Sequence, residues 1–385
     1  MDFKYTEEQT QLADLISRFV SKGYDFDTRR ENIATKGGFD PGVWTQLAEM
    51  GVFAMTIPEE YDGLGGNSVD TLVIMQELGK GMLTEPYLAT VVLGAGLIAA
   101  AGSIEQKAAI LPGVAAGETK LAFAHSEAKA RYNLSYVEAT AAALGEGYVL
   151  NGQKVVVLGA EQADKIIVSA RTSGNVGDKE GISLFVVDAA AEGLAVQGYV
   201  NYDGQPAAEV TLTNVAINEV DMLGTEGHAY AAIEAITEVA IAAVCAEAVG
   251  IMDTLVNLTT EYLGTRKQFN MPLGGFQALQ HRLADMAMHR EQGRSMALLA
   301  TDAIVSAAPA QRAKIIAAAK SRVGEAATYV GQQAVQLHGG IGVTDELNVS
   351  HYFKRLTLIN TAFGDSGHHL GVFSDLMVSE IQSAA

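Results

Sequence analysis

An arginine and a pair of adjacent glycines could together bind a phosphorylated ligand. Arg266 carries a planar guanidinium whose several N–H donors suit the oxygens of a diphosphate. Gly339 and Gly340 have no Cβ atom, so the backbone there can approach a ligand to within hydrogen-bond distance. Gln277 and Gln336 offer donors and acceptors to the edges of an adenine or a ribose. Each feature alone is also typical of a solvated helix or of a glycine turn that ends one.

Glu247 is a carboxylate in the apolar run Val244–Val249. An unpaired carboxylate in such surroundings costs several kcal/mol once it is desolvated, so this one either meets a positive partner or does chemistry. The first alternative is a buried ion pair with a helix arginine. The second is a general base, which needs a carboxylate in a dry site.

The overall composition excludes some classes of protein. The chain has 385 residues, 49% of them hydrophobic and 18% charged, so it can bury a large core. Its formal net charge of −19 argues against a nucleic-acid partner. One cysteine, Cys245, excludes an intramolecular disulfide and is typical of a reducing compartment, where a buried inert thiol is its expected state.

The N-terminus and the longest apolar stretch indicate the cellular compartment in which the protein is expected. The first residues lack a charged-then-apolar signal pattern. The stretch Leu88–Ala101 is too short to span a bilayer. We therefore expect a cytoplasmic protein that does not insert into membranes.

Residues 6–117 have apolar positions at helical spacing, as in Leu12, Leu15 and Ile16. Thr6, with acids behind it, predicts a helix N-cap. Short β-rich runs follow at residues 148–157, 166–170, 182–187, 194–200 and 209–215. Asn151-Gly152 within the first run predicts the tight turn of a β-hairpin. These runs indicate a small antiparallel sheet or barrel.

From Gly227 onward the pattern is helical again. Residues 227–263 contain no proline and predict one long helix buried on most sides. Further helices are expected near residues 275–300, 310–337 and 345–385. The fold class is therefore α+β: an N-terminal helical domain (1–119), a central small antiparallel β domain (120–225) and a C-terminal four-helix bundle (226–385).

Several motifs, taken in order, resemble the acyl-CoA dehydrogenase family nearly end to end. They are Ile57-Pro-Glu-Glu-Tyr-Asp-Gly63-Leu-Gly-Gly, Glu77-Leu-Gly-Lys, Arg266-Lys-Gln-Phe269, Phe276-Gln277-Ala-Leu-Gln280-His-Arg-Leu-Ala-Asp285-Met and Gln336-Leu-His-Gly339-Gly340-Ile-Gly342. The resemblance implies FAD as cofactor, an acyl-CoA substrate and an electron-transfer flavoprotein or similar acceptor. It also implies that Arg266, Phe269, Gln277, Gln336, Gly339 and Gly340 contact the FAD of a neighbouring subunit, in a homo- or heterotetramer built as a dimer of dimers.

The resemblance weakens where the flavin ring would lie. The family has a Thr-Glu pair beside the ring, and Ser126-Glu127 matches it, with Ser126 offering the hydroxyl. The family's Trp-Ile-Thr strand is Val156-Val157-Leu158 here, and Leu158 cannot hydrogen-bond the ring. Small subunits of heteromeric enzymes of the pimeloyl-CoA and steroid side-chain types look similar in this region. The alternative is a drifted pocket that still binds FAD through backbone groups.

The catalytic base also departs from the family pattern. The family's usual glutamate position is Gly364 here, one residue before Asp365, and the position used by a second branch is Ala240. Asp365 is the first candidate for the base and Glu247 the second. The alternative role of Asp365 is to cap the helix that begins near Ser366. His368 and His369 are adjacent and point apart on a helix, so we expect no metal site.

Two functions follow from the resemblance. The first is a subunit that oxidises an acyl-CoA thioester to the trans-2-enoyl form with FAD. The second is a non-catalytic small subunit that completes the FAD site of a catalytic partner. Oxidases and monooxygenases share this fold and form a third possibility.

Overall fold

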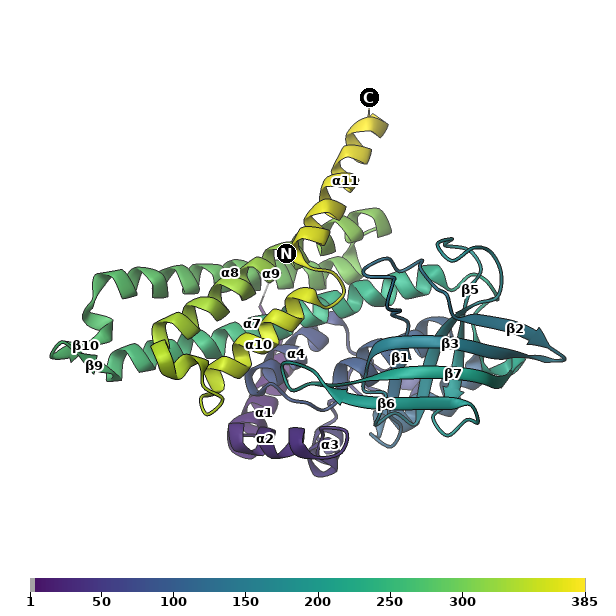
Figure 1. Ribbon diagram of the computed structural model, residues 1–385, viewed down its shortest axis with the longest axis horizontal. Helices are drawn as coiled ribbons and strands as arrows, with labels where there is room; N and C mark the ends of the chain where they lie inside the picture. Colours follow the sequence, from purple (N-terminus) through teal and green to yellow (C-terminus); the bar gives the residue numbers. More distant parts are fainter. Residues whose placement is uncertain (1–3, 385) are drawn as a thin grey trace.

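The computed structural model describes residues 4–384 and has three parts (Figure 1). The N-terminal helices are α1 (Glu7–Gly23), α2 (Phe26–Ala34), α3 (Pro41–Glu49), α4 (Ser68–Gly81), the π-helix η2 (Leu88–Ala95), α5 (Gly96–Ala101) and α6 (Ile104–Ala115). The predicted N-cap at Thr6 is confirmed, because its hydroxyl accepts from the Gln9 amide at 3.1 Å while the Gln9 side chain accepts from the Thr6 amide.

The central part is one eight-stranded sheet. Its strands are β1 (Leu121–Ala124), β2 (Thr140–Leu144), β3 (Gly147–Leu158), β4 (Lys165–Arg171), β5 (Ile182–Asp188), β6 (Leu194–Val200), β7 (Pro206–Asn218) and β8 (Met222–Leu223). The order is β6-β7-β3-β2-β4-β5-β8, with β1 beside β4. Most strand pairs are antiparallel, as expected, but β4 pairs in parallel with β1 and with the first residue of β2.

The hairpin predicted at Asn151-Gly152 is wrong. Both residues lie inside the continuous strand β3, and the chain turns earlier, at Gly145-Glu146 between β2 and β3. Gly152 has φ +149°, and a Cβ there would lie 2.6 Å from that of Ala139. The Asn151 side chain accepts from the Asn214 amide on β7 at 2.8 Å. Asn-Gly thus forms a bulge between β3 and β7 rather than a turn.

The C-terminal part consists of α7 (Tyr230–Thr265), α8 (Gln277–Ser306), α9 (Pro309–His338), α10 (Asn348–Thr361) and α11 (Ser366–Ala384). The single helix expected from residue 345 is two helices, because the chain bends at Phe363 and Gly364, with φ +57° and +109°. The last helix, α11, contacts α9 and projects from the body (Figure 1).

The long helix α7 is the centre of the structure. It packs on α4 and η2 of the N-terminal part and on α8, α9 and α10 of the bundle. Its most apolar 18-residue window is hydrophobic enough to cross a membrane, but 83% of that window is buried inside the protein. We therefore interpret α7 as the core helix that joins the helical parts, as the sequence predicts.

Candidate functional site

The residues predicted to bind a dinucleotide gather at one end of the bundle. Arg266 follows α7 and begins a short hairpin formed by β9 (Lys267–Gln268) and β10 (Met271–Pro272), seen at the far left of Figure 1. Phe269 lies in the turn of this hairpin with φ +53° and is 85% exposed. Gln277 is the first residue of α8, and its side chain is exposed. The hairpin and the start of α8 thus present a cation, an aromatic ring and an amide to solvent.

Gly339 and Gly340 reach the same end of the bundle from α9. Tyr262, near the end of α7, donates to the His338 carbonyl at 3.2 Å and stacks on the His338 ring at 4.4 Å. Gly339 has φ +67°, and a Cβ atom at either glycine would meet nothing within 4 Å. The exposed Gln336 lies one turn before this corner. The backbone here is therefore open to a ligand or a neighbouring chain.

This end of the bundle fits a diphosphate. Within residues 4–384, the Arg266 guanidinium has no hydrogen-bond or ion-pair partner, so its donors are free. Diphosphate oxygens need such donors, and they need a backbone that comes close without an intervening side chain. Both requirements are met on one surface.

Ser126 lies elsewhere, in the loop after β1. Its side chain is exposed, and its carbonyl accepts from the Val155 amide at 2.9 Å. Val156 on β3 is 52% exposed with φ +53°, and Leu158 ends the strand. A flat ring bound against Ser126, Val156 and Leu158 would meet aliphatic side chains and the Ser126 hydroxyl. The hairpin of Arg266 and the loop after β1 lie far apart in one protomer (Figure 1), so a site that uses both needs a second chain.

Asp365 caps a helix. Its Oδ1 accepts from the His368 amide at 2.8 Å, and its Oδ2 accepts from the Tyr132 hydroxyl at 3.4 Å. The hydrogen bond from the His368 amide is the main cause of a lowered Asp365 pKa, so this carboxylate is a weaker proton acceptor than usual. The predicted cap is present at the start of α11. The role of Asp365 as a base stays a prediction.

Glu247 is bound in an ion pair. Its two carboxylate oxygens accept from Arg355 Nε at 2.6 Å and from a terminal Arg355 nitrogen at 2.7 Å. The other terminal nitrogen donates to Asp203 at 2.9 Å. Desolvation lowers the pKa of Arg355, but the attraction of Glu247 and Asp203 outweighs it and raises the pKa overall. Of the two alternatives for Glu247, the structure shows the buried ion pair.

Gly364 leaves no room for a side chain. A Cβ atom there would lie 2.6 Å from His369 Nε2 and 2.7 Å from His368 Cδ2. His369 is buried and contacts the Phe363 carbonyl through Nε2 at 2.9 Å. The buried Lys320 contacts three backbone carbonyls around the turn, those of Ile359, Asn360 and Gly364. Imidazole rings therefore fill the place where the resemblance puts a glutamate.

The burial of His369 predicts a loss of stability in acid. Desolvation lowers its pKa from 6.5 to about 4. Between these values the unfolded chain binds more protons than the folded one, so stability is lost as the pH falls through this window, by roughly 3 kcal/mol. We expect His369→Gln to lose less stability over the same range in urea unfolding series. Equal losses in both proteins would contradict this assignment.

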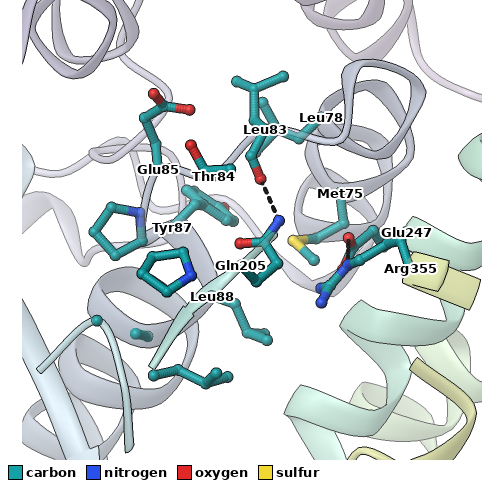
Figure 2. A pocket seen from close by; sticks show the side chains of 15 residues that line it. Met75, Leu78, Leu83, Thr84, Glu85, Tyr87, Leu88, Gln205, Glu247 and Arg355 are labelled. Atoms are coloured by element: carbon teal, nitrogen blue, oxygen red, sulfur yellow. Dashed lines mark hydrogen bonds and ion pairs between the residues drawn. The ribbon is translucent and has the colours of Figure 1, made fainter. Parts of the chain in front are cut away.

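Two of the cavities within residues 4–384 lie beside α4 and α7. A small one of about 60 Å³ lies between α4, residues 83–89 and the end of β3, beside Leu158 and the Glu247–Arg355 pair (Figure 2). Roughly four water molecules would fill it. A larger cleft of about 320 Å³ lies between the start of α4, η2 and the first turns of α7, and no charged side chain lines it.

Known proteins match this architecture along its length. Models of the acyl-CoA dehydrogenase N-terminal, middle and C-terminal domains match residues 6–118, 122–215 and 229–375. The probable acyl-CoA dehydrogenase YngJ of Bacillus subtilis is 30% identical over 373 residues, covering 95% of this chain and 97% of that protein. The chain belongs to the acyl-CoA dehydrogenase family.

Solved structures of acyl-CoA dehydrogenases have the same fold. Butyryl-CoA dehydrogenase from Megasphaera elsdenii matches with a TM-score of 0.91 at 26% identity, over 98% of this chain and 100% of that one. The ChsE4–ChsE5 complex from Mycobacterium tuberculosis matches with a TM-score of 0.89 at 25% identity, over 98% and 99%. The predicted fold class, an N-terminal helical part, a β part and a C-terminal helical part, is confirmed.

The chain is accordingly a subunit of an acyl-CoA dehydrogenase, an FAD-type oxidoreductase that acts on acyl-CoA. When bound, FAD supplies the acceptor for the hydride that leaves the acyl group. Arg266 and the Gly339–Gly340 backbone would hold its diphosphate, and Ser126 would face its ring. These individual contacts remain predictions.

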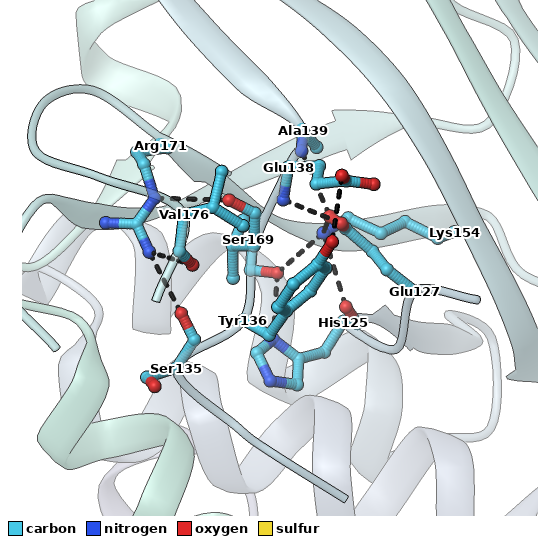
Figure 3. Close-up of polar contacts among 11 residues, drawn as sticks. His125, Glu127, Ser135, Tyr136, Glu138, Ala139, Lys154, Ser169, Arg171 and Val176 are labelled. Atoms are coloured by element: carbon cyan, nitrogen blue, oxygen red, sulfur yellow. Dashed lines mark hydrogen bonds and ion pairs between the residues drawn. The ribbon is translucent and has the colours of Figure 1, made fainter. Parts of the chain in front are cut away.

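Sequence reasoning missed several residues that shape the site. Tyr132, Lys320 and Arg355 contact or surround the two candidate bases. Lys154 and Glu127, the residue after Ser126, form a buried ion pair (Figure 3). The sequence did contain one sign of this ion pair. Lys154 is followed by three valines in an apolar strand, and a lysine buried in such a strand needs an anionic partner.

Proposed function

We propose that this chain is the small subunit of a heteromeric acyl-CoA dehydrogenase. In this assembly it completes the FAD site of a catalytic partner chain and does not itself remove the substrate proton. The observation that carries the proposal is the turn at Gly364, where imidazole rings lie in the place of a carboxylate.

The two candidate bases, Asp365 and Glu247, are both engaged. Proton removal next to a thioester needs a carboxylate that is free to accept a proton in a dry site. Asp365 accepts hydrogen bonds from a helix amide and a tyrosine, and its pKa is lowered. Among residues 4–384, protonation of Glu247 would leave Arg355 with Asp203 as its one anionic partner. Both geometries favour structural roles.

The cavity beside Leu158 and the exposed end of the bundle support the role of a small subunit. The cavity beside Leu158 is small, about 60 Å³, and the Glu247–Arg355 ion pair lines it. The bundle end, in contrast, offers free donors and an open backbone to a neighbouring chain. The matched ChsE4–ChsE5 structure is itself a complex of two differently named chains. We propose a dimer of dimers that acts on a bulky acyl group and passes electrons to an electron-transfer flavoprotein or a similar acceptor.

Anaerobic titration of the purified chain tests the proposal. The chain alone, mixed with FAD and a panel of acyl-CoA thioesters, is expected to show no bleaching of the flavin absorbance. The same titration with a co-expressed catalytic partner is expected to bleach the flavin. Bleaching by the chain alone that disappears in Asp365→Asn would instead establish self-sufficient catalysis by Asp365.

Gly364→Ala tests the crowding at the turn. The added methyl group meets the His368 and His369 rings, and φ is +109°, so we expect a loss of stability of about 1–3 kcal/mol. Thermal unfolding of this variant beside Gly371→Ala measures the effect, because a Cβ at the helical Gly371 would meet nothing within 4 Å. Equal melting temperatures for the two variants would show that the turn can accommodate a methyl group at residue 364.

A further inference from the structure

A buried carboxylate with few partners lies in the segment that joins α4 to η2. Glu85 is 6% exposed, and its Oε2 has no hydrogen-bond partner in the part of the chain that the structure describes. Its Oε1 lies 3.5 Å from the Asp40 amide, at the limit of a hydrogen bond. Of the described lysines, arginines and histidines, none forms an ion pair with Glu85. Figure 2 shows its carboxylate pointing away from the Glu247–Arg355 pair.

The titratable groups that face Glu85 are neutral or anionic. They are the Tyr24 hydroxyl, just after α1, and the Asp40 carboxylate, at the start of α3. The buried Arg29 on α2 donates instead to the carbonyls of Met82 and Asp203, at 2.9 and 2.6 Å. Desolvation therefore raises the pKa of Glu85 from 4.5 to about 7, so this carboxyl exchanges its proton near neutral pH.

The segment that carries Glu85 forms a wall of the small cavity beside Leu158. Residues 83–89 all line this cavity. We call residues 82–87 the strap. The Leu83 carbonyl of the strap accepts from Gln205 Nε2 of the β domain at 2.8 Å, a contact drawn in Figure 2. The cavity can widen on this side only if the strap moves, and the strap carries the buried carboxyl.

We propose that the strap is a proton-controlled gate of the cavity beside Leu158, closed while Glu85 is protonated and opened when Glu85 gives its proton to the solvent. A charged carboxylate is costly in a dry position without a counter-charge, so ionisation favours states in which the strap exposes Glu85 to water. The gate goes beyond the subunit role proposed above and does not depend on it.

The direction of the pH dependence follows from proton binding. The closed strap binds the Glu85 proton more tightly than the open strap, where the carboxyl regains its ordinary pKa of 4.5. The closed state is therefore fully favoured below pH 4.5 and loses stability as the pH rises to about 7. Over this window the equilibrium constant for opening rises about tenfold per pH unit, and above it the constant levels off.

Hydrogen exchange of the strap tests the gate. Amides 83–88 of the full chain are compared at about pH 5.5 and 7.5, as protection factors, which correct for the intrinsic pH dependence of exchange. We expect protection in the wild-type chain to fall about twentyfold between these two values. Glu85→Gln keeps the volume of the side chain and cannot ionise, so its protection factors should be equal at both.

Glu77→Gln is the matched control. Glu77 is also a buried glutamate, but it lies on α4 and pairs with Lys80 at 2.5 Å. Its replacement removes a buried carboxylate and leaves Glu85 in place. We expect the same fall in protection of the strap as in the wild-type chain.

Trp44 provides a second readout, since it is the one tryptophan of the sequence. Its ring stacks on Phe53 at 4.0 Å, and the Phe53 ring lies 6.4 Å from that of Tyr87 in the strap. Opening of the strap should therefore change the Trp44 fluorescence. We expect a change between about pH 5.5 and 7.5 in the wild-type chain and none in Glu85→Gln.

Two results would overturn the gate. One is protection of the strap that does not change with pH in the wild-type chain, a result that needs no variant. The other is an equal fall in wild type and Glu85→Gln, which would assign the pH dependence to another group. Should Glu85→Gln fail to fold, Asp40→Asn takes its place, because asparagine also caps helices and the lost charge should move the fall to lower pH. An unmoved fall in Asp40→Asn would likewise contradict the gate.

Discussion

Arg355→Met is expected to lower the free energy of unfolding by about 3–5 kcal/mol, the range observed when one partner of a buried pair is removed. Arg355 on α10 holds Glu247 on α7 and Asp203 in the β domain, and all three side chains are at most 13% exposed. Removing the guanidinium leaves the buried Glu247 carboxylate without its ion-pair partner and takes away the direct ion pair of Asp203, which keeps the nearby Arg29. Urea unfolding of the full chain measures the effect.

A surface pair provides the matched control. Lys129 and Glu138 are 3.1 Å apart but 73% and 43% exposed, so Lys129→Met should change stability by less than about 1 kcal/mol. A loss below about 1 kcal/mol in Arg355→Met would contradict the view that this pair is structural, and it would reopen the base role of Glu247. Asp203 belongs to the same network, because its carbonyl also accepts from Arg29 at 2.6 Å.

Arg266→Ala is expected to weaken FAD binding to the assembled protein by about a hundredfold or more. The guanidinium would make two charge-assisted hydrogen bonds to the diphosphate, each contributing about 1.5–3 kcal/mol. Its side chain has no partner within residues 4–384, so its loss should cost the folded chain little. Flavin retained after gel filtration and a dissociation constant from fluorescence measure the effect.

Arg18→Ala serves as the control for a lost surface arginine. Arg18 lies on α1, and within residues 4–384 its guanidinium makes one hydrogen bond, to the Asp14 carbonyl at 3.0 Å. Its replacement should leave FAD binding unchanged. Wild-type affinity in Arg266→Ala would remove the bundle end from the cofactor site. Arg266→Lys should recover only part of the affinity, since an ammonium cannot form the planar two-pronged contact.

Periodicity in the sequence was sufficient for most of the fold. The apolar spacing of α1 and the long apolar run of α7 each predicted a helix that the structure contains. The hairpin at Asn151-Gly152 failed because the same dipeptide also suits a bulge, and only the pairing of β3 with β7 distinguishes the two. That pairing is a long-range contact that no local pattern records.

Only part of the candidate site was predictable, because its other part also depends on long-range contacts. The order of Arg266, Phe269, Gln277 and the Gly339–Gly340 pair indicated one nucleotide site, and the structure brings all of them to one end of the bundle. The surroundings of the candidate bases were not predictable. Arg355 is 108 residues from Glu247, and Tyr132 is 233 residues from Asp365. Whether a carboxylate is free or engaged depends on such partners, which only the folded chain brings together.

An experimental structure of the flavin-loaded assembly would be decisive for the interchain site. We expect the Arg266 guanidinium and the Gly339–Gly340 backbone to contact the diphosphate of an FAD whose ring lies on another chain, with a carboxylate of that chain at its acyl side. A structure in which Arg266 and both glycines face open solvent, with no nucleotide or neighbouring chain in reach, would contradict the proposed function.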